Sequence, residues 1–382
     1  MAGERFDIAV IGAGIAGASV ASELAGGEGG KAGRIVLLER ESQPGYHTTG
    51  RSAALFSTTY GPPVIRALSR ASARFFDAPP EGFAAHALLG PRGVMMIARA
   101  DQSAQLAALM DELGEGRAWL LDAIETRRLA PLLREGYAAG AVFEPEARDI
   151  DVNALHHGYL RRLRGAGGVV KNDCALYGLS REGEAWRLET GEGAIHADVV
   201  VNAAGAWADE VAAMAGIPAI GLVPKRRTAL TVKAPEGMEP SAWPMVVDIE
   251  EEFYLKPEAG RLLLSPADET PSPPCDAQPE ELDIAICIDR IERAFALQIR
   301  HIESRWAGLR SFVADKCPVA GFETGAPGFF WLAGQGGYGI QSAPALAKVA
   351  AALLAGREIP AEIADEGVLP AALSPARLEG RG

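Results

Sequence analysis

A glycine-rich run near the start of the chain has the spacing that binds the diphosphate of a dinucleotide. The run is GAGIAG, and it separates a mostly apolar stretch from a segment of helical composition. In this arrangement Gly12 permits a tight turn, Gly14 lets the backbone approach the phosphates, and Gly17 lets the helix pack closely on the strand. The first turn of the helix adds unpaired N–H groups and a partial positive charge. A glycine turn that binds nothing is the alternative.

An acidic residue at the end of the next apolar stretch supports the dinucleotide interpretation. Glu39 follows the stretch 34–38, and its carboxylate can accept hydrogen bonds from ribose hydroxyls while it repels a 2′-phosphate. The pattern of strand, glycine loop, helix and strand therefore predicts a βαβ unit over residues 6–39. FAD and NAD share this fingerprint, so the unit alone leaves the choice between them open.

A second glycine-rich loop, GQGGYG from Gly334 to Gly339, lies near the C-terminus before a predicted helix. A junction of this kind points N–H groups at a ligand, and the pyrimidine edge of a flavin suits them because negative charge grows there on reduction. A packing turn is the alternative for this loop taken alone. A nicotinamide dehydrogenase usually places its catalytic residues after a compact Rossmann domain, so the two loops together favour FAD.

The composition is that of an ordinary soluble globular protein. The 382 residues are 48% hydrophobic and 23% charged, and the formal net charge is −13. Such a negative field repels phosphate backbones, so we expect no nucleic-acid partner. The basic run Lys225–Arg227 is either a solvated charged loop or part of a local basic pocket.

The cysteines and histidines give no pattern typical of a metal site. The four cysteines are scattered without a CxxC pair, which predicts neither zinc nor disulfides and fits a reducing compartment. His156 and His157 are adjacent and cannot share one ligand face of a helix. No apolar run reaches the ~18–20 residues of a membrane span, and no secretory signal is recognisable. We expect a cytoplasmic protein, with attachment to the inner face of a membrane left open.

Predicted strands and helices alternate along much of the chain, with Pro-punctuated strands between residues 217 and 282. Isoleucines and a phenylalanine at three- and four-residue steps predict a long amphipathic helix over 284–302. We expect an α/β (α+β) fold of two domains built from discontinuous segments. Residues 1–80, 148–216 and 305–375 would form a Rossmann-like FAD-binding domain. Residues 81–147 and 217–304 would form a β-sheet domain that binds substrate.

Several motifs in order along the chain resemble one flavoprotein superfamily. They are GAGIAGAS, ERESQPGYHTTGRSAA, DIDVNALHHGYLR, VVNAAGAWAD, PKRR, FYLKP, WAGLRSFVAD and GQGGYGIQ, and they extend from residue 12 to residue 341. Together they resemble the D-amino-acid oxidase/glycine oxidase superfamily, and among its members most closely the bacterial D-arginine dehydrogenases. Nearly the whole chain is covered by this resemblance.

The resemblance implies a set of residues that bind FAD. Glu39 and Arg40 would meet the adenosine ribose, Val170 would hold the adenine through its backbone, and 336–340 would line the pyrimidine end. The matching stretch near Gly308 lacks the cysteine of covalent relatives, and Cys317 is expected to be a buried small side chain, so FAD would be non-covalent. The full set is Gly12, Gly14, Ile15, Ala16, Gly17, Glu39, Arg40, Thr48, Thr49, Gly50, Arg51, Ser52, Ala53, Ala54, Val170, Ala204, Gly205, Trp207, Gly334, Gly336, Gly337, Tyr338, Gly339 and Ile340.

The resemblance also implies a carboxylate clamp for the substrate. A planar guanidinium matches a carboxylate with two parallel hydrogen bonds, and the matching residues are Arg227 and Arg310, with Tyr254 adding a hydroxyl. Lys225 and Arg226 would be solvated or structural. The other matching residues are Tyr60 of an active-site loop, with packing on Phe56 as its alternative, and Gly337 and Gln341 at the main-chain end of the substrate.

The implied reaction is oxidation of a D-amino acid by hydride transfer from Cα to flavin N5, followed by hydrolysis to a 2-oxo acid and ammonia. A quinone or another carrier would accept the electrons in preference to oxygen. Leu55 and Val94 stand where D-arginine dehydrogenases have a histidine and an acidic residue, which predicts weaker use of D-Arg and D-Lys and better use of apolar D-amino acids. The alternatives are oxidation of sarcosine-like secondary amines or 2-hydroxy acids, an inactive flavin-binding module, and a nicotinamide-linked dehydrogenase.

Overall fold

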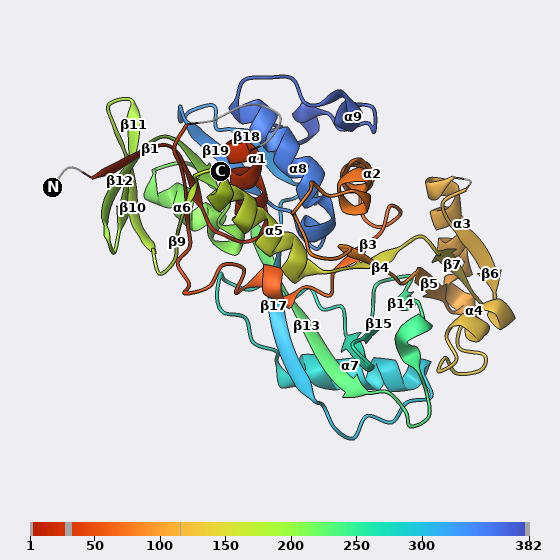
Figure 1. Ribbon diagram of the computed structural model, residues 1–382. Helices are drawn as coiled ribbons and strands as arrows, with labels where there is room; N and C mark the ends of the chain where they lie inside the picture. The colour runs from red at the N-terminus through yellow and green to blue at the C-terminus, as the bar shows by residue number, and fades with distance from the viewer. Residues whose placement is uncertain (1–2, 27–32, 115, 379–382) are drawn as a thin grey trace.

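The computed structural model describes residues 3–26, 33–114 and 116–378, and their strands form two large sheets and one small one (Figure 1). The first sheet has eight strands, five of them parallel neighbours in the order β9, β2, β1, β12, β19. Its strands are β1 (Glu4–Ile11), β2 (Ile35–Leu38), β9 (Val169–Lys171), β10 (Leu176–Glu182), β11 (Ala185–Thr190), β12 (Gly193–Asn202), β18 (Val319–Phe322) and β19 (Phe329–Ala333).

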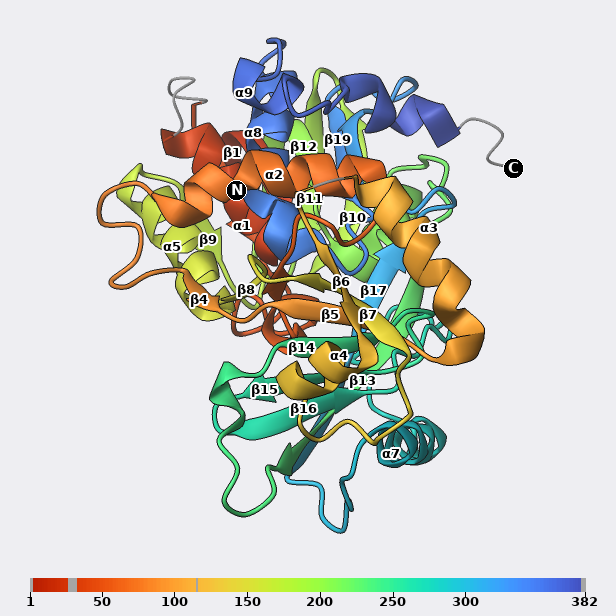
Figure 2. The ribbon, with the colours of Figure 1, turned by 90° about the vertical axis from the view of Figure 1, so that its right-hand side faces the viewer.

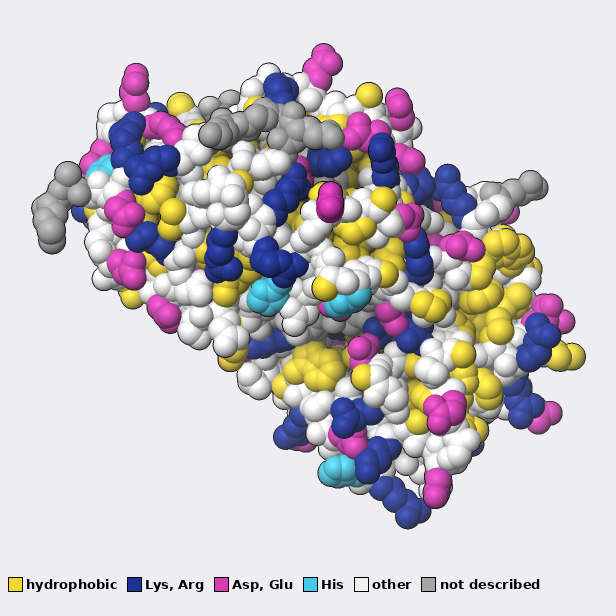
Figure 3. Space-filling view, in the orientation of Figure 1, with side chains coloured by type: hydrophobic (Ala, Val, Ile, Leu, Met, Phe, Trp, Pro, Cys, Tyr) yellow, Lys and Arg dark blue, Asp and Glu magenta, His cyan; other side chains and the backbone are white. Residues whose placement is uncertain are grey.

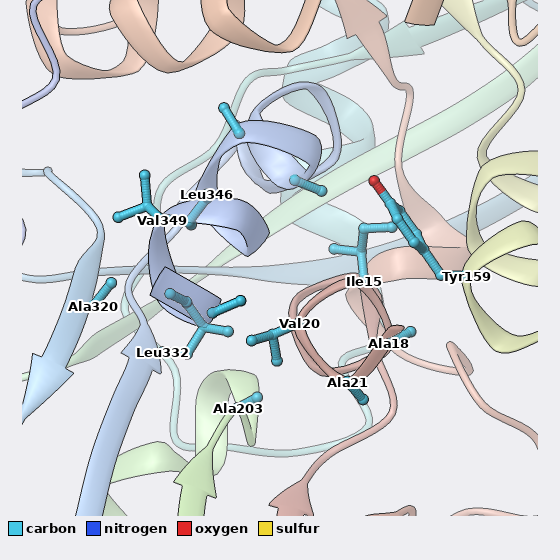
Figure 4. Packing of buried hydrophobic residues seen from close by; sticks show 14 of the residues in the cluster. Ile15, Ala18, Val20, Ala21, Tyr159, Ala203, Ala320, Leu332, Leu346 and Val349 are labelled. Carbon is cyan, nitrogen blue, oxygen red and sulfur yellow. The ribbon is translucent and has the colours of Figure 1, made fainter. Parts of the chain in front are cut away.

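Helices from distant parts of the chain cover one face of this parallel sheet. They are α1 (Ile15–Gly26), α5 (Val152–Gly165) and α8 (Gly339–Leu354), and α2 (Pro63–Asp77) packs on α8. Figure 4 shows side chains of α1, α5, α8 and the strand ends meeting in one buried cluster. The short helix α6 (Ala208–Met214) packs on the opposite face. Strands covered on both faces are mostly apolar, as in residues 8–11 of β1, in β2 and in residues 199–201 of β12.

The predicted α/β fold class is confirmed, and most predicted elements lie within a few residues of their expected bounds. Asp151 caps α5 as expected, because its carboxylate accepts a hydrogen bond from the Ala154 N–H at 2.8 Å. The helix predicted over 284–302 is wrong at its end. It is α7 (Glu281–Ala294), and Phe295 has extended backbone and bridges to Leu133. Ile299 and Ile302 pack against the same core from a segment without regular secondary structure, which explains their apolar spacing.

The second large sheet also has eight strands, and one face of it is covered by α7. Its strand order is β17-β13-β16-β15-β14-β5-β7-β6, antiparallel except for the β14–β5 pair. The bounds are β5 (Val94–Ala98), β6 (Trp119–Asp122), β7 (Gly140–Glu144), β13 (Val223–Lys233), β14 (Met245–Asp248), β15 (Tyr254–Glu258), β16 (Arg261–Ser265) and β17 (Ser304–Phe312). The division into two domains stays a prediction, and β17 pairs with the second sheet although it lies in a segment assigned to the first domain.

Three further features complete the frame around the site. Helices α3 (Ser103–Leu113) and α4 (Ala123–Leu129) flank the β6 end of the second sheet (Figure 2). The three-stranded sheet of β3 (Leu55–Phe56), β8 (Arg148–Ile150) and β4 (Leu89–Pro91) carries the chain between the large sheets. A short helix, α9 (Ala361–Ala364), packs on α2. No helix among the described residues has the length and apolar character of a membrane span.

The edge strand β6 and the neighbouring α4 expose apolar side chains. They include Trp119, Leu120 and Ile124, and hydrophobic side chains gather over this part of the molecule in Figure 3. The opposite situation holds at α7, where Ile291 is fully buried against the second sheet. Isoleucine is thus exposed at position 124 in α4 and fully buried at position 291 in α7.

We expect Ile291→Ala to lower the free energy of unfolding by about 2–5 kcal/mol, because it removes buried methyl groups and leaves a cavity. The matched control is Ile124→Ala, whose side chain is 81% exposed and whose loss should change stability by at most about 0.5 kcal/mol. Thermal and urea unfolding of the two variants test this. Equal losses of stability would contradict the assignment of α7 to the core.

Candidate active site

A cavity of about 570 Å³ runs along the carboxyl ends of β1, β2 and β12, where ligands bind in open α/β sheets. Most residues predicted to bind FAD line it: Gly12, Gly14, Ile15, Ala16, Glu39, Arg40, Thr48, Thr49, Arg51, Ser52, Ala53, Ala204, Gly205, Trp207, Gly334, Gly336, Gly337, Gly339 and Ile340. Ala54 and Tyr338 line a second cavity instead. Gly17, Gly50 and Val170 line neither, and Val170 is a backbone partner of β2.

The glycine turn at Gly12 has the close contacts that its sequence predicts. Gly12 has a positive φ of 96°, and a Cβ there would lie 2.5 Å from the carbonyl oxygen of Ala203. A Cβ on Gly17 would lie 1.9 Å from the carbonyl oxygen of Gly12. Gly17 therefore acts by letting α1 pack on the turn, and Gly12 keeps the turn tight. The N-terminus of α1 is left facing the cavity.

Two side chains fix the loop that opens this cavity. The buried Glu39 carboxylate accepts hydrogen bonds from the N–H groups of Ala13 and Glu41, each at 3.0 Å. Thr49 Oγ1 accepts one from the Ile15 N–H at 2.9 Å. Each carboxylate oxygen of Glu39 has a further acceptor site, so the residue can also meet ribose hydroxyls.

The segment 48–51 connects the cavity to the second sheet. Thr48 donates a hydrogen bond to the Leu309 carbonyl at 2.7 Å, and Arg51 donates to the carbonyls of Ala277 and Ala307, each at 3.0 Å. Arg51 lines the cavity and also pairs with Asp276. The Arg51 guanidinium and the N-terminus of α1 both line this cavity, and both features attract phosphates. The donor set and the cradle of glycines fit an FAD molecule.

The sequence did not reveal several residues of the cavity wall. Cys174 and Tyr177 follow β9, and Tyr177 has 70% of its side chain exposed at the mouth of the cavity. Their only signal is their position after a predicted short strand. Gln335 lies within GQGGYG, lines the cavity, and carries a buried amide nitrogen without a partner among the described residues. Its motif could have identified it.

A second cavity of about 560 Å³ meets the first at the predicted carboxylate clamp. The residues that line both cavities are Ser52, Ala53, Arg227, Tyr254, Arg310, Gly337 and Ile340. Tyr254 is buried in β15 and faces this junction. The cavities therefore place the clamp between the expected flavin site and a separate space of the size that small-molecule ligands occupy.

The register of β13 and β17 explains why Arg227 reaches the junction and the adjacent Arg226 does not. Arg227 lies opposite Gly308, so Arg310 is its diagonal neighbour on the same face of the sheet. Arg226 points to the opposite face because side chains alternate along a strand. There its guanidinium pairs with Asp283 of α7 at 2.9 Å. Of the two roles predicted for Arg226, solvated or structural, the structure shows the structural one.

The two clamp arginines differ in their partners. Arg227 donates a hydrogen bond from Nε to the Asp268 carbonyl at 2.9 Å and lies 3.3 Å from a Glu269 carboxylate oxygen. Burial and the nearby Arg310 lower the pKa of Arg227. In the described part of the chain, no carboxylate lies within ion-pairing distance of the Arg310 guanidinium. A Cβ on Gly337 would lie 2.9 Å from that guanidinium, so Gly337 keeps the space beside it open.

The charge of Arg310 is favoured at the junction despite its burial. Burial alone would lower the pKa of this guanidinium, but the phenols of Tyr60 and Tyr254 and the Glu251 carboxylate raise it, and the net direction is upward. A cation held in this way without an ion-pair partner is a binding position for an anion. The junction can therefore hold a substrate carboxylate.

Tyr60 and Gln341 lie on the second-cavity side of the clamp. The Tyr60 hydroxyl donates to Glu251 at 3.1 Å, and its ring packs edge-on against Tyr338 with centroids 5.2 Å apart. Packing of Tyr60 on Phe56 is not observed, because Phe56 packs with Phe76. Burial raises the pKa of Tyr60, and it raises that of Tyr338 to about 12, so both phenols stay protonated at neutral pH.

Only one of the two polar atoms of the Gln341 amide has a hydrogen-bond partner among the described residues. Its oxygen accepts a hydrogen bond from the Ser57 N–H at 3.1 Å, while its nitrogen is buried and has no partner among the described residues. An unpartnered buried donor is costly unless a ligand completes it. Gln341 lines the second cavity, and its nitrogen is a donor that no described residue uses.

Leu55 and Val94, the residues predicted to set specificity, both line the second cavity. They share this wall with the apolar side chains of Met96, Met245 and Val247. Three carboxylates also line it, from Glu112, Glu144 and Glu251, and no sequence motif predicted them. Each already has a partner: Glu112 pairs with Arg66, Glu251 accepts from Tyr60, and Glu144 accepts from residues 57–59.

Histidine and cysteine do not form a metal site in the described ranges, where no group of three or more His, Cys, Asp or Glu could hold an ion. His156 instead hydrogen-bonds the Ala13 carbonyl at 2.8 Å, and burial lowers its pKa. His47 lies 2.9 Å from Glu41 and packs near Trp207 in the first cavity. Cys317 is half-buried, where a buried side chain was expected, and it lines neither cavity.

Comparison with known proteins agrees with this geometry. The family model DAO, described as FAD dependent oxidoreductase, matches residues 7–353. Glycine oxidase from Geobacillus kaustophilus is 24% identical over 379 residues, which cover 94% of this chain and 96% of that protein. The solved structure of L-proline dehydrogenase from P. horikoshii has a TM-score of 0.80 at 21% identity and 99% coverage of both chains, which is a likeness of fold.

A longer relative matches only in part. 4-Methylaminobutanoate oxidase (formaldehyde-forming) from Paenarthrobacter nicotinovorans is 25% identical over 261 residues, or 67% of this chain. The chain spans 31% of that protein's length.

Arg226 and Arg227 lie on opposite faces of β13, and this difference gives a direct prediction. Arg227→Met should lower kcat/KM by roughly 30-fold to several thousand-fold, because losing one partner of a desolvated charge pair costs about 2–5 kcal/mol. Arg226→Met should keep kcat/KM near the wild-type value but destabilise the fold, because it leaves Asp283 buried without its cation. Steady-state kinetics and thermal unfolding of both variants measure this contrast. A reversed pattern would place the clamp on the wrong face of β13.

Proposed function

The chain belongs to the DAO family of FAD-dependent oxidoreductases, and we propose that it oxidises D-amino acids with apolar side chains at the α-carbon. The observation that carries this proposal is Arg310, a cation without an ion-pair partner among the described residues at the junction of the two cavities. Arg227 and Tyr254 line the same junction. A carboxylate bound there completes the charge balance of the site.

The residues contribute position and electrostatics to the reaction. FAD, when bound, supplies the hydride acceptor. The two guanidiniums hold the carboxylate, and the free amide nitrogen of Gln341 is placed to bind the main-chain end of the substrate. The amine loses a proton from nitrogen and a hydride from Cα to give an imino acid, and water then releases a 2-oxo acid and ammonia. Holding the Cα–H in one orientation is the main service of the clamp.

The wall of the second cavity supports an apolar side chain. Leu55, Val94 and Val247 offer no charge, and the three carboxylates of the wall already have hydrogen-bond or ion-pair partners. A guanidinium or ammonium group that lies against the apolar side chains of this wall has no counter-ion there, and burying an unpaired charge is costly. We therefore propose that D-Arg and D-Lys are weaker substrates than apolar D-amino acids, in contrast to the D-arginine dehydrogenases that the sequence resembles.

Secondary amines, glycine and 2-hydroxy acids form the second candidate class. The names of the relatives favour it, since they include a glycine oxidase, an L-proline dehydrogenase and a methylaminobutanoate oxidase. A carboxylate clamp serves all of these substrates equally. The size of the second cavity supports a substrate with a side chain larger than that of glycine.

Other parts of the proposal follow from the sequence and the family. FAD would be held without a covalent bond, because no cysteine stands near Gly308 on the clamp side of the cavity. Residues 1–80, 148–216 and 305–375 would form the FAD domain, and 81–147 and 217–304 the substrate domain. We propose a quinone or another carrier as electron acceptor and a cytoplasmic location, with contact at the inner face of a membrane as an open possibility.

Anaerobic bleaching of the flavin by a panel of compounds tests the substrate class. The panel is D-Leu, D-Phe, D-Arg, L-Leu, glycine, sarcosine and D-2-hydroxyglutarate. We expect D-Leu or D-Phe to reduce the flavin fastest, with D-Arg at least tenfold slower. A kcat/KM for D-Arg that exceeds the others by orders of magnitude would defeat the apolar preference, and bleaching by sarcosine alone would move the enzyme to the second class. Comparing peroxide release with dye reduction in the same reactions identifies the acceptor.

A further inference from the structure

A buried carboxylate beside the clamp has no assigned task. Glu144 ends β7, lies directly opposite Val94 of β5, and has only 3% of its surface exposed. It lines the second cavity, yet no Lys, Arg or His of the described ranges comes within ion-pairing distance of it. A buried carboxylate without a cation persists only when hydrogen bonds replace its water.

Four hydrogen bonds from one short segment satisfy this carboxylate. Oε2 accepts from Ser57 Oγ at 2.5 Å and from Thr59 Oγ1 at 2.6 Å. Oε1 accepts from the Thr58 N–H at 2.9 Å and from Thr58 Oγ1 at 3.0 Å. An ionised carboxyl group has about four acceptor sites. The segment 57–59 therefore uses the full acceptor capacity of Glu144.

The same segment holds the residues that face the substrate space. Ser57 donates its N–H to the Gln341 side-chain oxygen at 3.1 Å, and the Gln341 nitrogen is left without a partner among the described residues. Ser57 Oγ also accepts from the Tyr60 N–H at 3.2 Å. A chain of contacts thus runs from Glu144 through Ser57 to both Tyr60 and Gln341.

We infer that Glu144 is a positioning residue that sets Tyr60 and Gln341 against the substrate by anchoring residues 57–60. The inference rests on the proposed function, because it assigns Tyr60 and Gln341 to substrate binding. It also excludes the other role open to a carboxylate in this cavity. With its acceptor sites occupied, Glu144 is not the counter-ion of a basic substrate side chain.

Glu144→Gln tests the anchor with little change of shape. The amide keeps one oxygen for Thr58 but presents N–H donors to Ser57 and Thr59, so those two hydroxyls can no longer donate to residue 144 and their bonds must reverse or break. We expect KM for the best substrate of the panel to rise at least tenfold while kcat changes less than threefold. We also expect Tyr60→Phe to add little to the KM of the Glu144→Gln protein, because both changes disturb one unit.

Hydrogen exchange of the peptide that contains 57–60 gives a readout that does not depend on turnover. It should accelerate in the FAD-loaded Glu144→Gln protein, whether or not any compound of the panel proves to be a substrate. Failure of the proposed function would thus leave the panel inactive and this exchange result unaffected. The matched control is Asp209→Asn, whose carboxylate accepts the N–H groups of Ile220 and Leu222 at 3.0 and 2.8 Å and lines neither cavity. It should leave KM and exchange at 57–60 unchanged.

Two results would overturn the inference. One is unchanged exchange at 57–60 together with an unchanged KM in Glu144→Gln. The other is a selective loss of D-Arg oxidation with D-Leu unaffected, which would make Glu144 a counter-ion for substrate. If Glu144→Gln does not fold, the double variant Ser57→Ala/Thr59→Ala removes the two donors to Oε2, and the same rise in KM and faster exchange are expected from it.

Discussion

The antiparallel register of β13 and β17 is the constraint on which the candidate site depends. It places Arg227 opposite Gly308 and so brings Arg310 beside Arg227 on one face of the sheet. Two guanidiniums in one buried site repel each other, and Arg310 accordingly lowers the pKa of Arg227. Glu269 offsets only the Arg227 side. The arrangement is best satisfied when an anion binds between the arginines, and the two cavities meet at that point.

The rest of the structure holds this junction from two directions. The parallel sheet and its helices bring the glycine turn, Glu39 and the GQGGYG loop to one side, where the FAD family requires a cofactor. On the other side the second sheet supplies an apolar wall, with α7 packed behind it. Arg51 and Thr48 donate hydrogen bonds from the first side to carbonyl groups of β17. The position of the clamp relative to the cofactor cavity is therefore fixed by contacts between the sheets.

Local patterns in the sequence were sufficient for much of this description. Asp151 caps α5 through the Ala154 N–H, and Gly17 lets α1 pack on the turn at Gly12, so both act through neighbours in the chain and could be predicted. The pairing register of strands that lie far apart in the sequence could not be predicted from local patterns. Glu144, Glu251 and the stretch 174–177 reach the cavities only because strands distant in sequence pair in a particular alignment. The helix expected over 284–302 ends early for a related reason, since Ile299 and Ile302 contact the core from an irregular segment with the same spacing as a helix.

The central claim is that the Arg310 guanidinium binds the carboxylate of the substrate. Titration of the FAD-loaded protein with 4-methyl-2-oxopentanoate and with its uncharged amide, followed by the flavin absorption spectrum, tests it without turnover. The account predicts saturable binding of the acid at least tenfold tighter than that of the amide, and loss of this difference in Arg310→Met. Equal binding of acid and amide, or a preference for the acid that survives Arg310→Met, would contradict it.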